Sequence, residues 1–182
     1  DRRVSYVTGS VLSTTNNYRG KKLLNSTFEG VDVRERIFSR FKRELLSIPA
    51  DPDNAFMTAQ RKIYDHITDR YYSFSAPTST GKSFIMRIFM KQQILEGKKN
   101  NFALIVPTKA LINEVRIKVT EDLGTNLKKY GYHIVTAAGD AALQVEPKLP
   151  EECRNYILIM TPERLLYLLI NEKELHIDYL FI

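Results

Sequence analysis

The sequence predicts an α/β fold in which a parallel sheet is covered by helices on both faces. Segments of strand length alternate with segments of helix length along most of the chain, which is the order of elements in a parallel sheet. Several of the strand segments are continuously apolar, as strands buried on both faces of a sheet usually are. A loop of small residues also joins one predicted strand directly to the helix that follows it.

Residues 1–53 are predicted to form a partly helical N-terminal extension. Residues 1–30 are polar, and we expect loop or a partly ordered tail there. Residues 32–47 are typical of an amphipathic helix, because Arg and Lys separate apolar side chains that recur every four residues. These apolar residues are Val33, Ile37, Phe41 and Leu45. Four residues, Pro49, Asp51, Pro52 and Asp53, end this helix.

Residues 54–182 are predicted to form the α/β domain, although the sheet is expected to be partial. A helix is expected from about Asn54 to Thr68, followed by a strand at Tyr71–Ser75 and a helix to about Glu96. The later strands are expected at 102–106, 134–136, 156–160 and 178–182. Between them, we expect a helix after Thr108 and another that begins at Pro162 and runs to about Ile170.

The stretch Ala76–Ser83 carries the strongest chemical signal in the chain. It ends in Gly-Lys-Ser between a predicted strand and a predicted helix, the context of a phosphate-binding loop of nucleoside triphosphatases. In such loops, backbone N–H groups converge on an anion. Lys82 is expected to reach the β- and γ-phosphates, and the Ser83 hydroxyl is expected to bind Mg²⁺. Ala76 replaces the first Gly of the usual pattern, and an accidental polar turn is the alternative.

Small polar motifs follow four of the predicted strands. Ligands of parallel sheets bind at the carboxyl ends of the strands, so these motifs are expected to share one edge. Hydroxyls, backbone N–H groups and helix N-termini are common contacts of nucleic-acid phosphates. Each motif alone is more simply explained as a strand-to-helix turn, but four on one edge favour a shared surface. They are Ala76–Ser83, Pro107–Leu111, Ala138–Asp140 and Thr161–Arg164.

The formal net charge of +6 is unevenly distributed. Residues 87–130 contain nine Lys or Arg and four Asp or Glu, whereas residues 141–182 contain four and seven. A basic segment suits a polyanion such as nucleic acid. From charge alone, however, solvated helix faces are the more usual explanation.

Other compositional features limit the class of protein. The single cysteine, Cys153, excludes an internal disulfide framework and fits a reducing compartment, so a cytoplasmic protein is expected. No apolar run is long enough to cross a bilayer, and no membrane partner is expected. The scattered histidines His66, His133 and His176 do not have the spacing of metal ligands. Because the chain starts without Met, we expect an excised fragment.

An aromatic cluster precedes the loop. Its side chains are suited to stacking on a base, but within a strand they are expected to pack in the core or on the sheet. They are Tyr71, Tyr72 and Phe74.

These motifs resemble those of the first RecA-like motor domain of superfamily 2 helicases, the DEAD/DEAH-box proteins. Ala76–Ser83 is similar to motif I, Val106–Leu111 to motif Ia, and Thr161–Leu165 to motif Ib. Gln60 stands where the family has an adenine-reading glutamine. The stretch Thr136–Asp140 and the Ala-Pro-Thr-Ser start of motif I resemble the Ski2-like branch. The resemblance covers about residues 54–182.

The resemblance implies ATP and Mg²⁺ as cofactors and a nucleic-acid single strand, DNA or RNA, as partner. Lys82 would be the catalytic residue, and Ser83 would hold the metal. The nucleotide-binding residues would be Gln60, Thr78, Ser79, Thr80, Gly81, Lys82 and Ser83. The residues that grip the strand's backbone would be Pro107, Thr108, Lys109, Gly139, Asp140, Thr161, Pro162 and Arg164. For the threonines, helix capping is the alternative role, and for the charged residues it is solvated surface.

The family's Asp-Glu box follows a strand such as Asp178–Ile182, and it supplies the Mg²⁺-binding Asp and the Glu that activates water. The resemblance therefore implies that catalysis needs residues beyond Ile182 and a second motor domain of the same full-length chain. This fragment is expected to bind nucleotide weakly and to be inactive alone. The full-length protein is expected to be an ATP-dependent helicase or translocase. The alternatives are a double-strand DNA translocase subunit of a restriction or defence complex and a non-motor P-loop protein.

Overall fold

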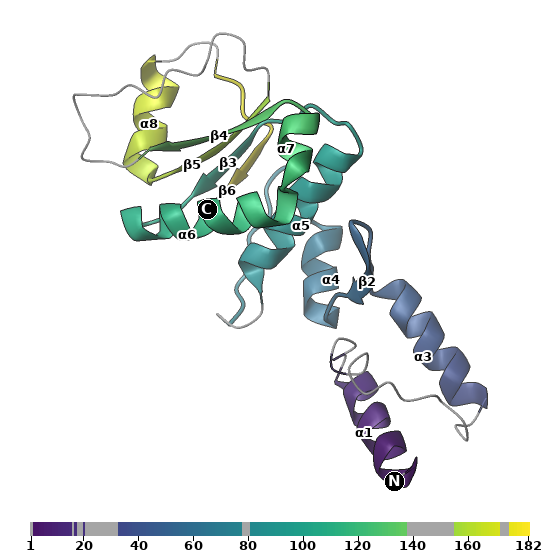
Figure 1. Cartoon of the computed structure of the whole chain (residues 1–182). Helices are drawn as coiled ribbons and strands as arrows, with labels where there is room; N and C mark the ends of the chain where they lie inside the picture. The colour runs from purple at the N-terminus through teal and green to yellow at the C-terminus, as the bar shows by residue number, and fades with distance from the viewer. Residues whose placement is uncertain are drawn as a thin grey trace. The chain divides into compact units, whose positions relative to one another are not determined.

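The computed structural model describes residues 2–15, 17, 20, 33–77, 81–137, 155–171 and 175–182. The chain divides into two units, Asp1–Phe89 and Met90–Ile182, and Figure 1 labels most of their helices and strands. In the part of the chain that the structure describes, no helix has both the length and the apolar character needed to cross a membrane.

The second unit is built around a parallel sheet. Its described strands pair in the spatial order β4-β5-β3-β6, and every pairing is parallel. The strands are β3 (Phe102–Ile105), β4 (Tyr132–Ala137), β5 (Asn155–Met160) and β6 (Tyr179–Phe181). Every residue of β3 and β5 is buried, as their continuous apolar runs predict. The predicted parallel α/β sheet, flanked by helices in a RecA-like arrangement, is confirmed.

Two connections cross the sheet in opposite directions. From β3 the chain passes through α6 (Lys109–Leu123) and α7 (Thr125–Lys129) to β4, two places to one side. From β5 it passes through α8 (Pro162–Asn171) to β6, two places to the other side. Because such crossovers are right-handed, opposite directions put the helices on opposite faces. Figure 1 shows α6 and α8 on the two sides of the sheet.

The sheet buries side chains on both faces. On one face, α8 contributes Leu165 and Leu168 to a cluster with residues of β3 and β5. The strand members of that cluster are Ala103, Ile105, Tyr156, Leu158 and Met160. The intervening residues of β5 are also fully buried, and α6 lies against β4 and β5 with Ile112, Val119 and Leu123 buried. Burial of each such aliphatic side chain stabilises the fold by about 1.5–3 kcal/mol.

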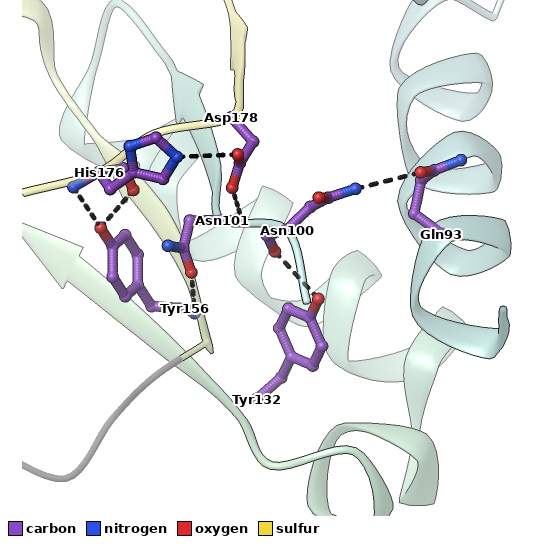
Figure 2. A network of polar contacts seen from close by, with 7 residues as sticks. All are labelled: Gln93, Asn100, Asn101, Tyr132, Tyr156, His176 and Asp178. Atoms are coloured by element: carbon purple, nitrogen blue, oxygen red, sulfur yellow. Dashed lines mark hydrogen bonds and ion pairs between the residues drawn. The ribbon is translucent and has the colours of Figure 1, made fainter. Parts of the chain in front are cut away.

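Side-chain hydrogen bonds hold the amino-terminal edge of this sheet (Figure 2). Asn101, buried just before β3, donates its N–H to Asp178 Oδ2 at 2.7 Å. Its Oδ1 accepts from the N–H of Tyr156 at 3.1 Å, and its carbonyl oxygen accepts from the N–H groups of Asp178 and Tyr179. One residue therefore ties together the starts of β3, β5 and β6. Asp178 Oδ1 also lies 3.0 Å from His176 Nε2.

Tyr132 at the start of β4 joins the same edge. Its hydroxyl donates to the carbonyl oxygens of Lys98 and Asn100, at 2.8 and 2.9 Å. The Asn100 side chain in turn donates to Gln93 Oε1 on α5 at 3.1 Å, as Figure 2 shows. All four strands of the sheet are therefore anchored at their amino ends by buried or half-buried polar groups.

The first unit contains helices and a short hairpin. Its described elements are α1 (Arg2–Thr14), α3 (Val33–Leu45), β1 (Ser47–Ile48), β2 (Asp51–Ala55), α4 (Thr58–Asp65) and the start of α5 (Lys82–Leu95). Ile48, Phe56 and Ile88 form its buried cluster, with Tyr64 and Phe84 packed against them. The rings of Phe56 and Tyr64 lie 4.9 Å apart, centroid to centroid.

The N-terminal part differs from the sequence prediction in two places. Residues 2–14 form α1 rather than loop, because Val4, Val7 and Val11 recur at helical spacing. The Pro- and Asp-rich stretch after α3 is also more than a helix stop. It forms the β1–β2 hairpin, which the N–H of Phe56 closes by donating to the Leu46 carbonyl at 2.7 Å.

The predicted strand at Tyr71–Ser75 is also wrong, since the structure assigns no strand to these residues. Their aromatic side chains are not in the core either, and Tyr71 is 85% exposed. Tyr72 stacks between His66 and Phe74, with ring centroids 5.4 and 5.7 Å apart. Tyr72 and Phe74 therefore stack on each other rather than packing in a strand.

Candidate functional site

The predicted site residues fall in both units. Gln60, Gly81, Lys82 and Ser83 belong to the first, and the motifs after β3 and β5 belong to the second. Five predicted site residues lie outside the described residues, and for them the roles stay predictions. They are Thr78, Ser79, Thr80, Gly139 and Asp140.

Lys82 is the first residue of α5, a 14-residue helix. Its Nζ donates to the carbonyl oxygen of Ala76 at 2.6 Å and so links the two ends of the Ala76–Ser83 stretch. The N–H of Ile85 bonds the Gly81 carbonyl, which is the first intrahelical bond. The N–H groups before it have no partner within the helix and carry its positive dipole end. This helix start therefore has the donors and the charge of an anion site.

Gly81 occupies a position that favours glycine. Its φ of +78° lies in the left-handed region, where other residues are strained. A Cβ at this position would also lie 2.9 Å from Gln60 Nε2, too close for any real contact. The backbone conformation therefore favours glycine, and a side chain here would displace the Gln60 amide.

Gln60 lies against this turn because α4 holds it there. Its Oε1 accepts from the N–H of Met57 at 2.9 Å, which forms half of a capping box at the helix start. Gln60 is 8% exposed, and its amide nitrogen lies close to Gly81. The structure thus brings the predicted adenine-reading residue and the predicted phosphate loop together within one unit.

The described residues fit a nucleoside triphosphate with Mg²⁺. Gly81 keeps the turn free of a side chain, Lys82 supplies a cation at a helix N-terminus, and Ser83, with its hydroxyl, is exposed in the first turn. A phosphate chain needs these donors, and Mg²⁺ needs a hydroxyl or carboxylate oxygen.

In the second unit, the motifs after β3 and β5 lie at one edge of the sheet. Ile105 is in register with Met160, and the N–H of Val106 donates to the Met160 carbonyl at 3.0 Å. The chain then leaves β3 toward α6 and leaves β5 toward α8, on opposite faces. This is the topological switch point at which open α/β sheets bind ligands.

Thr108 caps α6, because its Oγ1 accepts from the N–H of Leu111 at 3.4 Å. The capping alternative for this threonine is therefore observed. Pro107, Thr108 and Lys109 are all exposed, so capping leaves this turn accessible to a ligand.

The motif after β5 is more buried than the motif after β3. Thr161 and Arg164 are only 4% and 6% exposed, whereas Pro162 is exposed. The Thr161 carbonyl accepts from the N–H of Arg164 at 3.1 Å, and the Arg164 guanidinium lies 5.0 Å from the Tyr167 ring centroid. Contact of these two side chains with a nucleic acid stays a prediction, and such contact requires them to become accessible.

Sequence reasoning missed two contacts. The Lys82–Ala76 bond has no local signal, because it depends on how the loop closes. The role of Gln60 in capping does have a local signal, since a glutamine three residues after a helix start is typical of a capping box.

Among the described residues, no group of three or more His, Cys, Asp or Glu is arranged to hold a metal ion.

Comparison with known proteins gives one match. The family model for the DEAD/DEAH box helicase matches residues 57–181, from the start of α4 to the end of β6. No significant match was found among curated proteins or among solved structures.

Proposed function

The chain belongs to the DEAD/DEAH box helicase family, and from this premise we propose that it is the ATP-binding part of a nucleic-acid motor. In the full-length protein, ATP hydrolysis would be coupled to movement on a nucleic-acid strand. The sequence features of the Ski2-like branch support placing it there. The proximity of the Gln60 amide to Gly81 is the observation that carries the proposal, because it places a candidate base-reading amide beside the candidate phosphate loop.

We assign separate roles to the residues of this unit. Lys82 binds the β- and γ-phosphates, Ser83 binds Mg²⁺, and Gln60 donates its amide N–H to the adenine edge. Bound ATP and Mg²⁺ would supply the phosphoryl group and the charge neutralisation for its transfer to water. The bond from Lys82 to the Ala76 carbonyl holds the ammonium at the loop, where phosphate oxygens would replace the carbonyl as its acceptor.

The nucleic-acid contacts are assigned to the switch-point edge of the sheet. Pro107, Thr108 and Lys109 are exposed there and offer backbone N–H groups, a hydroxyl and a cation. Thr161, Pro162 and Arg164 adjoin them across the β3–β5 pair. Contacts to the backbone predict low sequence specificity and strong salt dependence.

The test is ATP hydrolysis by the full-length protein in the presence of nucleic acid. Lys82→Ala should lower the rate by about 100-fold or more, because it removes a charge aimed at the transferred phosphate. Lys118→Ala is the matched control, since Lys118 is exposed and is paired with Glu114 on its own helix. Equal rates for the wild type and Lys82→Ala would contradict the motor assignment.

A further inference from the structure

Two segments meet at the amino-terminal edge of the sheet in the second unit. One follows α5 and contains Lys98, and the other ends α7 and enters β4. The Tyr132 hydroxyl donates to the carbonyls on both sides of Lys99, those of Lys98 and Asn100. The Tyr130 hydroxyl donates to the Leu95 carbonyl at 3.4 Å. These bonds fix the two segments side by side.

The segments bring together a group of exposed lysines, which we name the basic rim. It consists of Lys98, Lys99, Lys128 and Lys129. Lys98 is paired with Glu96 at 2.9 Å, and this lysine lowers the pKa of the Glu96 carboxyl. Among the described residues, no carboxylate lies within ion-pair distance of the other three lysines. The rim therefore presents uncompensated positive charge to solvent.

An aromatic ring lies within the basic rim. Lys129 Nζ lies 5.2 Å from the centroid of the Tyr130 ring, and the Tyr130 hydroxyl anchors that ring to the Leu95 carbonyl. A fixed ring beside several cations is suited to nucleic acid, because phosphates bind the ammonium groups and bases stack on the ring. An acidic peptide would use the charges alone.

The basic rim and the switch-point edge are at opposite ends of the strands. The six residues of β5 span about 20 Å from one edge to the other. At roughly 3.4 Å per nucleotide, the rise of a stacked strand, about six nucleotides cover that distance. A stacked strand shorter than this does not reach both surfaces.

We propose that the basic rim is a second nucleic-acid contact, which binds the phosphates of a strand that also passes over Pro107–Lys109. This rests on the proposed function, because it extends the path of the same nucleic acid. Under this proposal, the basic residues of the segment 87–130 have different roles. Lys109 lies at the switch-point edge, Lys118 is paired on its own helix, and the rim lysines form the second contact.

The test compares two charge-matched variants of the full chain by equilibrium binding to labelled single strands of about 20 and about 4 nucleotides. Lys128→Gln with Lys129→Gln changes the rim, and Arg116→Gln with Lys118→Gln removes the same charge from the middle of α6. All four side chains are exposed, and circular dichroism checks that both variants are folded.

For the long strand, we expect the rim variant to bind about 25-fold more weakly at about 0.1 M salt, with a salt-dependence slope reduced by about 1.4. The control variant should bind like the wild type, and the short strand should not distinguish the two. Equal losses in both variants, an unchanged long-strand affinity in the rim variant, or equally tight binding of polyglutamate would overturn the proposal. A nucleotide-binding measurement with Lys82→Ala reports separately on the proposed function.

Discussion

The two edges of the parallel sheet are built differently. At the amino-terminal edge, Asn101, Asp178, Tyr132 and Tyr156 tie the strands together with side-chain hydrogen bonds. At the switch-point edge, the exposed turn at Pro107–Lys109 is held by one helix cap. The amino-terminal edge is therefore fixed by side-chain hydrogen bonds between its strands, and the proposed ligand contact there is limited to the exposed lysines of the basic rim. At the switch-point edge, the turn itself is left accessible to a ligand.

The largest effect is expected from Asn101→Ala at the fixed edge. The change leaves the buried N–H of Tyr156 without its acceptor, and it should lower the free energy of unfolding by about 2 kcal/mol. Urea denaturation followed by circular dichroism measures it. Asn113→Ala, an exposed position on α6, is the matched control and should change stability little. Equal stability of the two variants would mean that the network does not hold the sheet.

A smaller effect is expected from Thr108→Ala at the open edge. Loss of the cap should cost about 0.5 kcal/mol, at the low end for such caps because the bond is 3.4 Å long. Thr108→Ser should restore stability, since it keeps the oxygen. If Thr108 also contacts the strand, Thr108→Ala weakens nucleic-acid binding more than its small stability loss explains. A cost as large as that of Asn101→Ala would erase the contrast between the edges.

The smallest effect concerns the ionisation of Tyr132, which changes stability only at alkaline pH. Burial, the dominant cause, raises the pKa of its phenol from 10.0 to about 12. Because the folded state holds this proton more tightly than the unfolded state, the contribution to stability is complete below pH 10. It is lost as the pH rises from 10 toward about 12. Stability measured across this range should fall less steeply for Tyr132→Phe, and identical slopes would contradict the assignment.

The strands of the parallel sheet could be predicted from the sequence, whereas the elements of the N-terminal unit could not. The reasons are physical. Strands β3 and β5 are apolar at every position because both faces are covered, and this signal is local. The β1–β2 hairpin depends instead on the burial of Ile48 and Phe56 against Ile88, which no local pattern reveals. The Tyr71–Ser75 segment has strand propensity, but propensity alone supplies no partner for its backbone.

Part of the candidate site could also be predicted from the sequence, and part could not. The Gly-Lys-Ser pattern indicates Lys82 and Ser83 because the chemistry fixes their spacing. Only the structure shows that Gln60 occupies the space beside Gly81. The burial of Thr161 and Arg164 was likewise unreadable, because it depends on packing around α8 rather than on their own motif.

The central claim is that Gln60 and the turn at Gly81 form one nucleotide site. ATP affinity of the full-length protein, measured by calorimetry, tests it with Gly81→Ala and Gly97→Ala as a matched pair. Both glycines have positive φ, 78° and 73°, but an added Cβ meets the Gln60 amide only at Gly81 and meets nothing at Gly97. A clash within the site should weaken ATP binding about tenfold or more in Gly81→Ala alone. Combining it with Gln60→Ala should remove the part of the loss that the clash causes. Equal ATP affinity in the two glycine variants would contradict the claim.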